Sequence, residues 1–222
     1  MLTVTAGTPD DLQSGLESQL AAYRHKVFVE QLGWKLPLAE AGLERDEFDR
    51  TDTVYVIARD DQGRVCGCGR LLPTTKPYLL GSVFPHLMGE QPLPCSTEVW
   101  ELSRYSTQAV DGEPPSHEES RRRFRVLLRT IVDAAIARGA QRLITFTVPT
   151  LERLSRQLGI HVHRVGPPQL IDGAPVVAMW VELDEQTCAA LGLEASEAVG
   201  GPLARPEAAP KNSLNSKGDM MI

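Results

Sequence analysis

One stretch of the chain restricts the fold more than any other, because residues 116–139 have the pattern of a single long amphipathic helix. Apolar side chains recur at helical spacing on one side, arginines occupy the opposite side, and Gly139 provides a stop. The apolar stripe consists of Phe124, Leu127, Leu128, Ile131, Val132 and Ile136. Such a helix has to bury one face, and the apolar run at 142–148 that follows has the length and composition of a buried strand. Helices packed on a sheet are therefore expected.

The rest of the chain predicts further helices and strands in alternation. Residues 8–11 (Thr-Pro-Asp-Asp) offer an N-cap, a proline for the first helical position and two acids for the helix dipole, so a long first helix should start here and end near Gly33. A shorter helix is expected from Thr150 to Leu158. Strands are expected at 53–59, 64–72, 97–105, 142–148, 160–165 and 176–183, the first two forming a hairpin.

This order predicts one domain over residues 1–194, an α/β (α+β) three-layer sandwich in which helices flank a sheet that is partly antiparallel and partly parallel. Residues 195–222 shift to Gly, Ala, Pro and Ser and are expected to form a disordered tail.

Composition and charge argue against several classes of protein. No apolar run approaches the roughly 20 residues that cross a bilayer, and the N-terminus lacks the pattern of a secretory signal, so no membrane association and a cytoplasmic location are expected. The four cysteines form no metal-binding spacing, and no metal is expected. A net charge of −6 argues against nucleic-acid binding, although arginines cluster between residues 121 and 142.

Two groups of residues carry chemical information in the first half of the chain. Arg24 and Phe28 lie one helical turn apart, and Trp34 follows just beyond the predicted helix end, so a cation and two aromatic rings are expected to converge. Arg70 lies on an otherwise apolar strand, where an unpaired charge would cost several kcal/mol. Carboxylates in the acidic run 44–49, which contains Asp46 and Asp49, are the expected partners of Arg70.

The run Trp-Glu-Leu-Ser-Arg at 100–104 makes a structural demand. Strict alternation would send Glu101 and Arg104 to opposite faces of a strand. If both line one site, the strand must carry a bulge or end there.

In this order along the chain, these residues resemble the acyl-homoserine-lactone synthase (autoinducer synthase) family of quorum-sensing bacteria. The matching elements are Arg24, Phe28, Trp34, Asp46, Asp49, the Arg70-Leu-Leu-Pro-Thr run, Phe84, Glu101, Ser103 and Arg104, and the segment 145–159 is similar to the family's acyl-chain region. The resemblance implies an N-acetyltransferase-like fold and an acyltransferase. It further implies that S-adenosylmethionine and an acyl-carrier-protein thioester, or acyl-coenzyme A in some members, are converted to N-acyl-homoserine lactone and methylthioadenosine. S-adenosylmethionine would be a substrate, and no cofactor is expected.

The resemblance also suggests roles for individual side chains. The expected catalytic residues are Glu101 as the base, Arg70, Asp49 and Ser103. S-adenosylmethionine is expected to contact Arg24, Phe28, Trp34, Asp46 and Arg104. The acyl-chain pocket is expected to contain Phe84, Ser103, Thr145 and Phe146, with Thr145 at a position where the family can hydrogen-bond a 3-oxo group. An acidic carrier protein is expected to dock on Arg121, Arg122, Arg125, Arg153 and Arg156.

Two other functions compete with this one. A general acetyl-coenzyme-A-dependent N-acetyltransferase would share the fold, but the glycine-rich run that would hold a pyrophosphate is not apparent near residues 105–120. A non-catalytic ligand-binding sensor would keep the pocket without turnover, and the presence of Arg70, Glu101 and Arg104 together argues against it.

Overall fold

The chain folds around one mixed sheet, and the computed structural model describes residues 2–36, 41–110 and 115–193. The predicted tail at 195–222 lies outside these ranges. The strands are β1 (Thr3–Gly7), β2 (Val54–Arg59), β3 (Val65–Pro73), β4 (Val99–Ser106), β5 (Arg142–Thr147), β6 (Val162–Arg164), β7 (Gln169–Ile171) and β8 (Ala174–Glu182). Their order is β1-β2-β3-β4-β5-β8-β6, with β7 paired to β8. Only the β4–β5 pair on this path is parallel, so the predicted mixture of pairings is confirmed.

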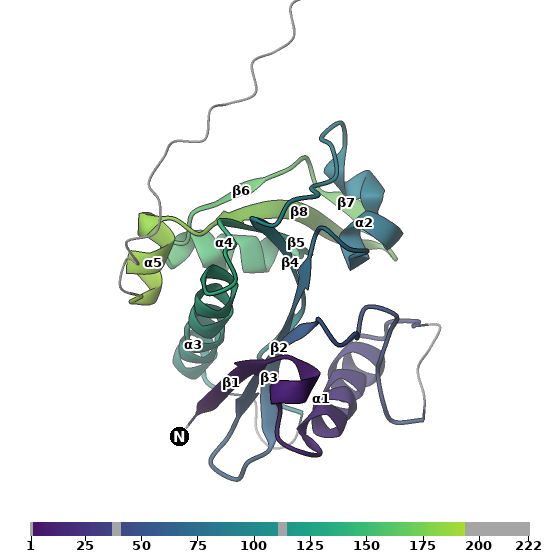
Figure 1. Ribbon diagram of the computed structural model, residues 1–222, viewed down its shortest axis with the longest axis vertical. Helices are drawn as coiled ribbons and strands as arrows, with labels where there is room; N and C mark the ends of the chain where they lie inside the picture. The colour runs from purple at the N-terminus through teal and green to yellow at the C-terminus, as the bar shows by residue number, and fades with distance from the viewer. Residues whose placement is uncertain (1, 37–40, 111–114, 194–222) are drawn as a thin grey trace, which may run out of the picture.

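Helices cover both faces of the sheet and give the three predicted layers (Figure 1). The main helices are α1 (Leu16–Arg24), α2 (Leu79–Val83), α3 (His117–Ile136), α4 (Pro149–Gln157) and α5 (Glu185–Leu191). The shorter turns are the 3₁₀ segments η1 (Pro9–Asp11) and η3 (Pro85–Met88), and a π-helical segment, η2 (His25–Gln31), continues α1. Helices α3, α4 and α5 lie on one face of the sheet, and α1 and α2 lie on the other. No helix in the described ranges is long and apolar enough to cross a membrane.

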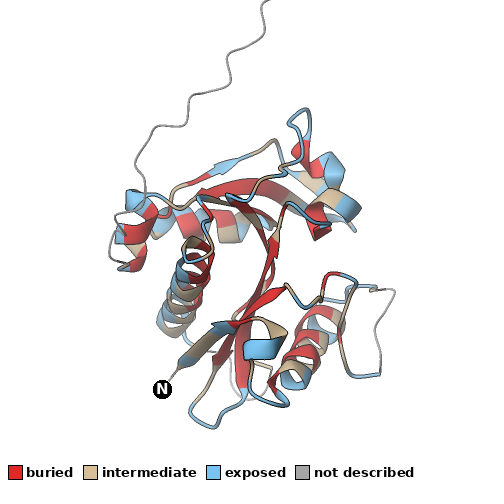
Figure 2. Cartoon of the chain, in the orientation of Figure 1, coloured by how far each residue is buried: buried red, intermediate tan, exposed pale blue. Residues whose placement is uncertain are grey.

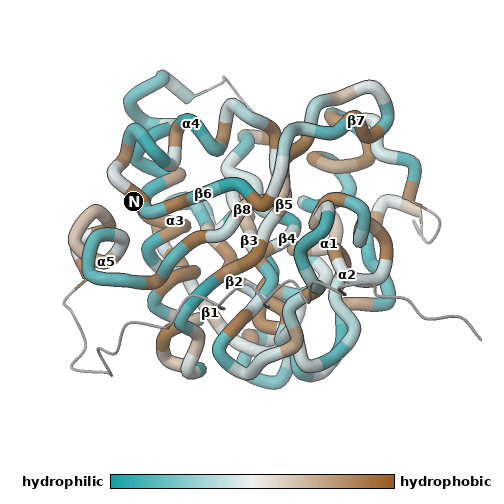
Figure 3. The backbone as a smooth tube through the Cα atoms, turned by 90° about the horizontal axis from the view of Figure 1, so that it is seen from above, coloured by the Kyte–Doolittle hydropathy of each residue, from teal (hydrophilic) through white to brown (hydrophobic). Residues whose placement is uncertain are grey.

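Alternation along the strands divides the core between these two faces. In β2, Val56 packs in the cluster that contains Phe124 and Ile131 of α3, whereas Ile57 packs with Leu20 of α1. A third cluster lies under α2 and η3 and includes Ile144 of β5. Figure 2 shows the central strands buried along most of their length, and Figure 3 shows hydrophobic segments along these strands and hydrophilic ones over α4. We call the two sides the α3 face and the α1 face.

The N-terminal region differs from the prediction in two ways. The predicted helix start at Thr8 is wrong: the Thr8–Asp11 capping box closes only the 3₁₀ turn η1, and α1 starts after Gly15, which adopts φ 81°. That left-handed backbone breaks the helix, because a glycine adopts it readily. The predicted end near Gly33 is confirmed, since η2 ends at Gln31. Four elements were not predicted from the sequence: β1, an edge strand that pairs with β2, and the short elements α2, β7 and α5.

A bulge in β4 places the side chains of Glu101 and Arg104 on the same face of the sheet. Arg70 of β3 pairs with Ser103, but Cys68 pairs with Ser106, so β4 has one residue more than β3 in this interval. Arg104 adopts φ 52°, one of two non-glycine positive values among the described residues. The extra residue places the Arg104 side chain on the α1 face together with Glu101, and the predicted bulge is confirmed.

Candidate active site

Three buried arginines and four carboxylates meet on the α1 face of the sheet. Arg24 ends α1, Arg70 lies in β3 and Arg104 lies in the β4 bulge. Their relative exposures are 2%, 0% and 6%. Burying three positive charges together requires neighbouring negative charges, and the segment 41–53 supplies them. The carboxylates are Glu44, Asp46 and Asp49 from this segment, and Glu101 from β4.

Arg24 is bound by carboxylates along its whole guanidinium group. Its Nε donates to Glu44, and its Nη1 and Nη2 donate to Asp49 at 2.7 and 3.0 Å. Burial acts to lower the pKa of Arg24, but the charges of Asp49 and Glu44 outweigh it and raise that pKa. This geometry favours a positioning role for Arg24, while the predicted contact between Arg24 and S-adenosylmethionine stays a prediction.

Arg70 is paired with the acidic segment, as the sequence predicted. Its Nη1 donates to Asp46 at 2.5 Å and to Asp49 at 3.2 Å, and its Nε donates to the Ser103 hydroxyl at 3.1 Å. Burial acts to raise the pKa of Asp49, but the charges of Arg24 and Arg70 dominate and lower it. The Phe48 ring lies 5.7 Å from the Arg70 guanidinium carbon and covers it. Asp46 and Asp49 thus brace Arg70.

Arg104 joins the carboxylates to the aromatic pair. Its Nη2 donates to Glu44 at 2.9 Å and to Asp46 at 2.8 Å. Its guanidinium carbon lies 5.7 Å from the Phe28 ring and 5.5 Å from the Trp34 ring, which stack on each other at 4.8 Å. Phe28 is buried, whereas Trp34 is 39% exposed, so the aromatic pair extends from the buried cluster to the surface. The two rings converge with a cation as predicted, but that cation is Arg104 and not the predicted Arg24, whose guanidinium group is bound to Glu44 and Asp49.

Glu101 is a buried carboxylate with a raised pKa. Its Oε2 accepts the N–H of Leu80 at 2.9 Å, and its Oε1 has no hydrogen-bond partner. Burial raises the pKa of Glu101 to about 7, against the lowering effects of the Leu80 N–H and the Arg70 charge. Arg70 Nη2 is likewise buried without a partner. A buried carboxylate oxygen and a buried guanidinium N–H therefore both have unused hydrogen-bonding capacity in this cluster.

The structure separates the residues predicted to line the acyl-chain pocket. Phe84 and Phe146 contact each other with ring centroids 5.1 Å apart, and they pack on the cluster that contains Ile144, on the same face as Ser103. Thr145 is paired with Leu102 and Met179, which belong to the core under α3. Thr145 therefore lies on the opposite face from the other three. The β4–β5 ladder ends at Leu102 and Thr145, although both strands continue beyond them.

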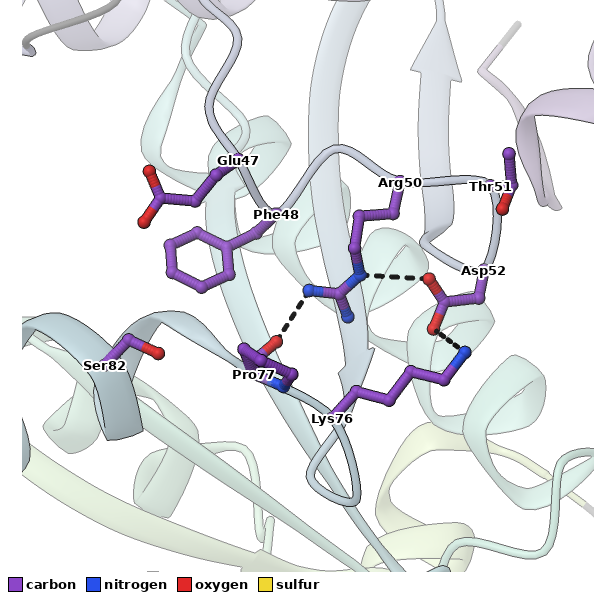
Figure 4. A pocket seen from close by; sticks show the side chains of 8 residues that line it. All are labelled: Glu47, Phe48, Arg50, Thr51, Asp52, Lys76, Pro77 and Ser82. Atoms are coloured by element: carbon purple, nitrogen blue, oxygen red, sulfur yellow. Dashed lines mark hydrogen bonds and ion pairs between the residues drawn. The ribbon is translucent and has the colours of Figure 1, made fainter.

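A depression of about 610 Å³ opens beside Phe48 (Figure 4). Arg50 holds one wall by donating from Nε to Asp52 at 3.0 Å and from Nη1 to the Pro77 carbonyl at 2.7 Å. Neither Arg70 nor Glu101 lines this depression, and Phe48 is the side chain that touches both it and Arg70. Phe48 thus separates the Arg70 guanidinium from this surface.

Two members of the cluster were not among the predicted site residues. Glu44 is fully buried and accepts from both Arg24 and Arg104, and the Tyr55 hydroxyl donates to Asp49 at 2.9 Å. No sequence signal singled out Glu44 within the acidic run, because the burial of its partners Arg24 and Arg104 is seen only in the structure. In the described part of the chain, no group of three or more His, Cys, Asp or Glu side chains is arranged to hold a metal ion.

The five predicted docking arginines are exposed on the α3 face, away from this cluster. Arg121, Arg122 and Arg125 lie in the first turns of α3, and Arg153 and Arg156 lie in α4.

Comparison with known sequences identifies close relatives along most of the chain. The family model described as autoinducer synthase matches residues 11–191. An acyl-homoserine-lactone synthase of Ralstonia solanacearum is 50% identical over 194 residues, which are 86% of this chain and 94% of that protein. One of Acinetobacter nosocomialis is 45% identical over 186 residues, which are 82% of this chain and 100% of that protein.

Solved structures of similar fold include further acyl-homoserine-lactone synthases. TofI, crystallised in a ternary complex with an inhibitor and MTA, is 45% identical, with a TM-score of 0.76 over 86% of this chain and 97% of that chain. BjaI, a CoA-dependent acyl-homoserine lactone synthase solved with SAM and isopentyl-CoA, is 26% identical, with a TM-score of 0.73 over 87% of this chain and 90% of that one. A putative N-acetyltransferase from Lactobacillus plantarum, 21% identical with a TM-score of 0.52 over 82% of this chain and 98% of that chain, shares the fold alone.

Proposed function

Because the chain belongs to the autoinducer synthase family, it is an enzyme that makes acyl-homoserine lactones from S-adenosylmethionine and an acyl donor, and we propose that the buried arginine–carboxylate cluster binds the S-adenosylmethionine and that the donor is an acyl-carrier-protein thioester. The relatives with high identity are synthases, and the likeness to an N-acetyltransferase extends to the fold only. The general acetyltransferase alternative therefore has little support.

The charge balance of the cluster supports binding of an amino acid. Arg104 is the arginine in the cluster with a lowered pKa, because burial and the charges of Arg70 and Arg24 act against its protonated form. An added carboxylate would relieve this repulsion, and Arg104 is our candidate for holding the carboxylate of S-adenosylmethionine. The stacked rings of Phe28 and Trp34 offer π faces to the sulfonium or the adenine, for a gain of about 0.5–2 kcal/mol.

Glu101 is our candidate for the general base. The α-ammonium must lose a proton before its nitrogen can attack the thioester, and a carboxylate with a pKa of about 7 can accept that proton at neutral pH. The new amide bond then forms as the carbon–sulfur bond of the thioester breaks and the carrier thiol leaves. Ser103, whose hydroxyl accepts from Arg70 at 3.1 Å, is placed on the face that would hold the thioester oxygen.

Lactone closure makes a different demand on the site. A carboxylate oxygen attacks the γ-carbon, the carbon–sulfonium bond breaks, and methylthioadenosine leaves as a neutral molecule. No proton moves in this step, so positioning of the carboxylate opposite the sulfonium accounts for the rate. Arg70 and Arg104 are braced by Asp46 at 2.5 and 2.8 Å, and this bracing supports such positioning.

The acyl donor in this proposal is an acyl-carrier protein. The exposed arginines of α3 and α4 suit an acidic carrier protein, although BjaI is described as CoA-dependent. S-adenosylmethionine acts as a substrate, and we expect no cofactor or metal to be needed. Four free cysteine thiols suit the reducing cytoplasm, where we place the enzyme.

The observation that carries this proposal is the pair of unsatisfied buried atoms, Glu101 Oε1 and Arg70 Nη2, within one cluster. The test is incubation of the full chain with S-adenosylmethionine and a panel of acyl donors, each acyl group supplied on carrier protein and on coenzyme A, with mass spectrometry of the products. We expect lactone and methylthioadenosine in equal amounts, with carrier-bound donors preferred. Methylthioadenosine without lactone, or neither product with any donor, would contradict the proposal.

A further inference from the structure

Tyr55 adds an uncharged side chain to the arginine–carboxylate cluster. It is buried in β2 and is the cross-strand partner of Arg70 in β3, so both side chains point to the α1 face. The Tyr55 hydroxyl donates to Asp49 Oδ1 at 2.9 Å. Burial and the charge of Asp49 raise the pKa of Tyr55, so the hydroxyl keeps its proton and remains a donor to this carboxylate.

The carboxylate of Asp49 is fully occupied by donors. Besides Tyr55, its Oδ1 accepts from Arg24 Nη1 at 2.7 Å and from Arg70 Nη1 at 3.2 Å. Its Oδ2 accepts from Arg24 Nη2 at 3.0 Å and from the Asp46 N–H at 2.9 Å. A carboxylate offers about four lone-pair sites, roughly two on each oxygen. Neither oxygen of Asp49 therefore has room for a further donor.

Arg70 keeps one N–H group that the surrounding side chains do not use. Its Nη1 donates to Asp46 and Asp49, and its Nε donates to Ser103, but its Nη2 is buried without a partner among the described residues. Because Asp49 already binds Nη1, a small movement of the guanidinium group would bring Nη2 to any vacant position on the same carboxylate. The Tyr55 hydroxyl occupies the position that would otherwise be vacant.

We propose that Tyr55 is a positioning residue: its hydroxyl saturates Asp49 Oδ1, so Asp49 cannot bind both Nη groups of Arg70, and Nη2 stays free to donate to S-adenosylmethionine. This inference rests on the proposed binding of S-adenosylmethionine by the cluster. Tyr55 acts through Asp49 and Arg70 and does not touch the reacting atoms. Without the hydroxyl, Arg70 turns toward Asp49 and the substrate loses a donor.

The first test removes one buried hydroxyl at a time. Tyr55→Phe is expected to raise the Kd for S-adenosylmethionine about tenfold, because a charged donor is diverted from the substrate to Asp49. Isothermal titration calorimetry on the full chain measures this without turnover. The matched control is Tyr23→Phe, since the Tyr23 hydroxyl is also buried on the α1 face but lies 2.9 Å from the Gln108 carbonyl oxygen and 3.2 Å from Ser106 Oγ. The control should lower Tm to a similar extent and leave the Kd within about twofold of wild type.

A double-mutant cycle decides whether Tyr55 acts through Arg70. Arg70→Lys keeps the charge but has no Nη2 donor, so it should raise the Kd about tenfold by itself. Adding Tyr55→Phe to Arg70→Lys should then change the Kd by less than about twofold, whereas two independent losses would multiply. A merely structural role for Tyr55 predicts that multiplication, because loosening of the segment 41–53 would weaken binding in either background. Thermal denaturation verifies that each variant is folded.

The results distinguish a failure of this inference from a failure of the proposed site. If Arg70→Lys binds S-adenosylmethionine as tightly as wild type, the proposed role of the cluster is wrong, and the role of Tyr55 with it. If Arg70→Lys is impaired and Tyr55→Phe is not, the proposal for Tyr55 alone is overturned. Equal impairment by Tyr23→Phe, or multiplying effects of Tyr55→Phe and Arg70→Lys, would overturn it in the same way.

Discussion

Glu101 has to be buried and still able to ionise, and these requirements oppose each other. Burial raises its pKa to about 7, and the Leu80 N–H and the Arg70 charge prevent a larger rise. At neutral pH the carboxyl group is therefore close to half ionised, which is the condition under which a general base combines availability with basicity.

For this residue we predict that Glu101→Gln lowers kcat by a factor of about 10² to 10⁴, because an amide cannot accept the ammonium proton. The wild-type kcat/KM should rise with pH through an apparent pKa of about 7 and then level off. Isothermal titration with S-adenosylmethionine should show binding retained within about tenfold. A variant with wild-type kcat, or a flat wild-type profile between pH 6 and about 8, would remove Glu101 from this role.

The same substitution should not destabilise the fold at alkaline pH. The pKa of Glu101 is raised from 4.5 in the unfolded chain to about 7 in the folded one, so the folded state holds the proton more tightly and loses stability as pH rises between these values. Above pH 7 the ionised carboxylate costs at most about 3 kcal/mol, and Glu101→Gln removes that cost. Urea denaturation at pH 8 and about pH 5 measures the difference, which should be larger at the higher pH.

At the scale of elements, Glu44 attaches the segment 41–53 to two other elements, beside the ion pairs formed by Asp46 and Asp49. The Glu44 N–H donates to the Ala21 carbonyl at 3.0 Å, and its carboxylate accepts from Arg24 of α1 and Arg104 of β4. One side chain therefore connects a helix, a strand and the segment that carries Asp46 and Asp49.

We predict that Glu44→Ala lowers the free energy of unfolding by about 3 kcal/mol and raises the KM for S-adenosylmethionine, because two buried guanidinium groups lose a shared partner. Glu44→Gln keeps an acceptor oxygen in the same shape and should lose less stability, while the charge of Arg104 remains less well compensated. Thermal denaturation and steady-state kinetics of both variants provide the check. Equal stability of Glu44→Ala and wild type would show that Asp46 and Asp49 hold the segment unaided.

The long elements could be predicted from the sequence because their signals are local. Helix α3 has a full apolar stripe, and β2, β3 and β5 are runs of β-branched and apolar residues between turns. Edge strand β1 and the short α2 bury too little to show a period, and Gly15 stops the first helix for a conformational reason that the apolar spacing does not reveal. Two features of the cluster could be predicted from the sequence: the pairing of Arg70 with carboxylates, and the bulge in β4. The role of Glu44 could not, because it depends on how three distant elements pack.

At the scale of the whole molecule, the sheet separates two groups of arginines. The arginine–carboxylate cluster lies on the α1 face, and the exposed arginines of α3 and α4 lie on the other, with the end of the β4–β5 ladder between them. Under the proposed function, the segment 41–53 contributes to acceptor binding and α3 and α4 contribute to donor docking, so a substitution on one face should leave the function of the other unchanged.

We predict that the enzyme does not need residues 195–222 for its activity or its stability. The family match ends at residue 191, and α5 is held by hydrogen bonds from Arg125 to the Ala190 carbonyl and from Gln186 to the Gly159 carbonyl. Removal of residues 195–222 should leave kcat/KM within about twofold and Tm within about 2 °C of the full chain. Truncation after Asp184, which also removes the buried side chains of Cys188 and Leu191, should lower Tm clearly. A loss of activity with the shorter deletion would contradict the predicted tail at 195–222.

The extra residue at the β4 bulge lets one strand present two adjacent side chains to the same face. Ser103 and Arg104 both point to the α1 face, whereas Leu102 and Tyr105 on either side of them pack in the core under α3. Deletion of residue 104 would restore regular alternation, so the remaining side chains of β4 would keep their faces and the cluster would lose the arginine that contacts Glu44, Asp46 and the two rings. The bulge thus adds a charged side chain to one surface of the sheet at no cost to the packing on the other.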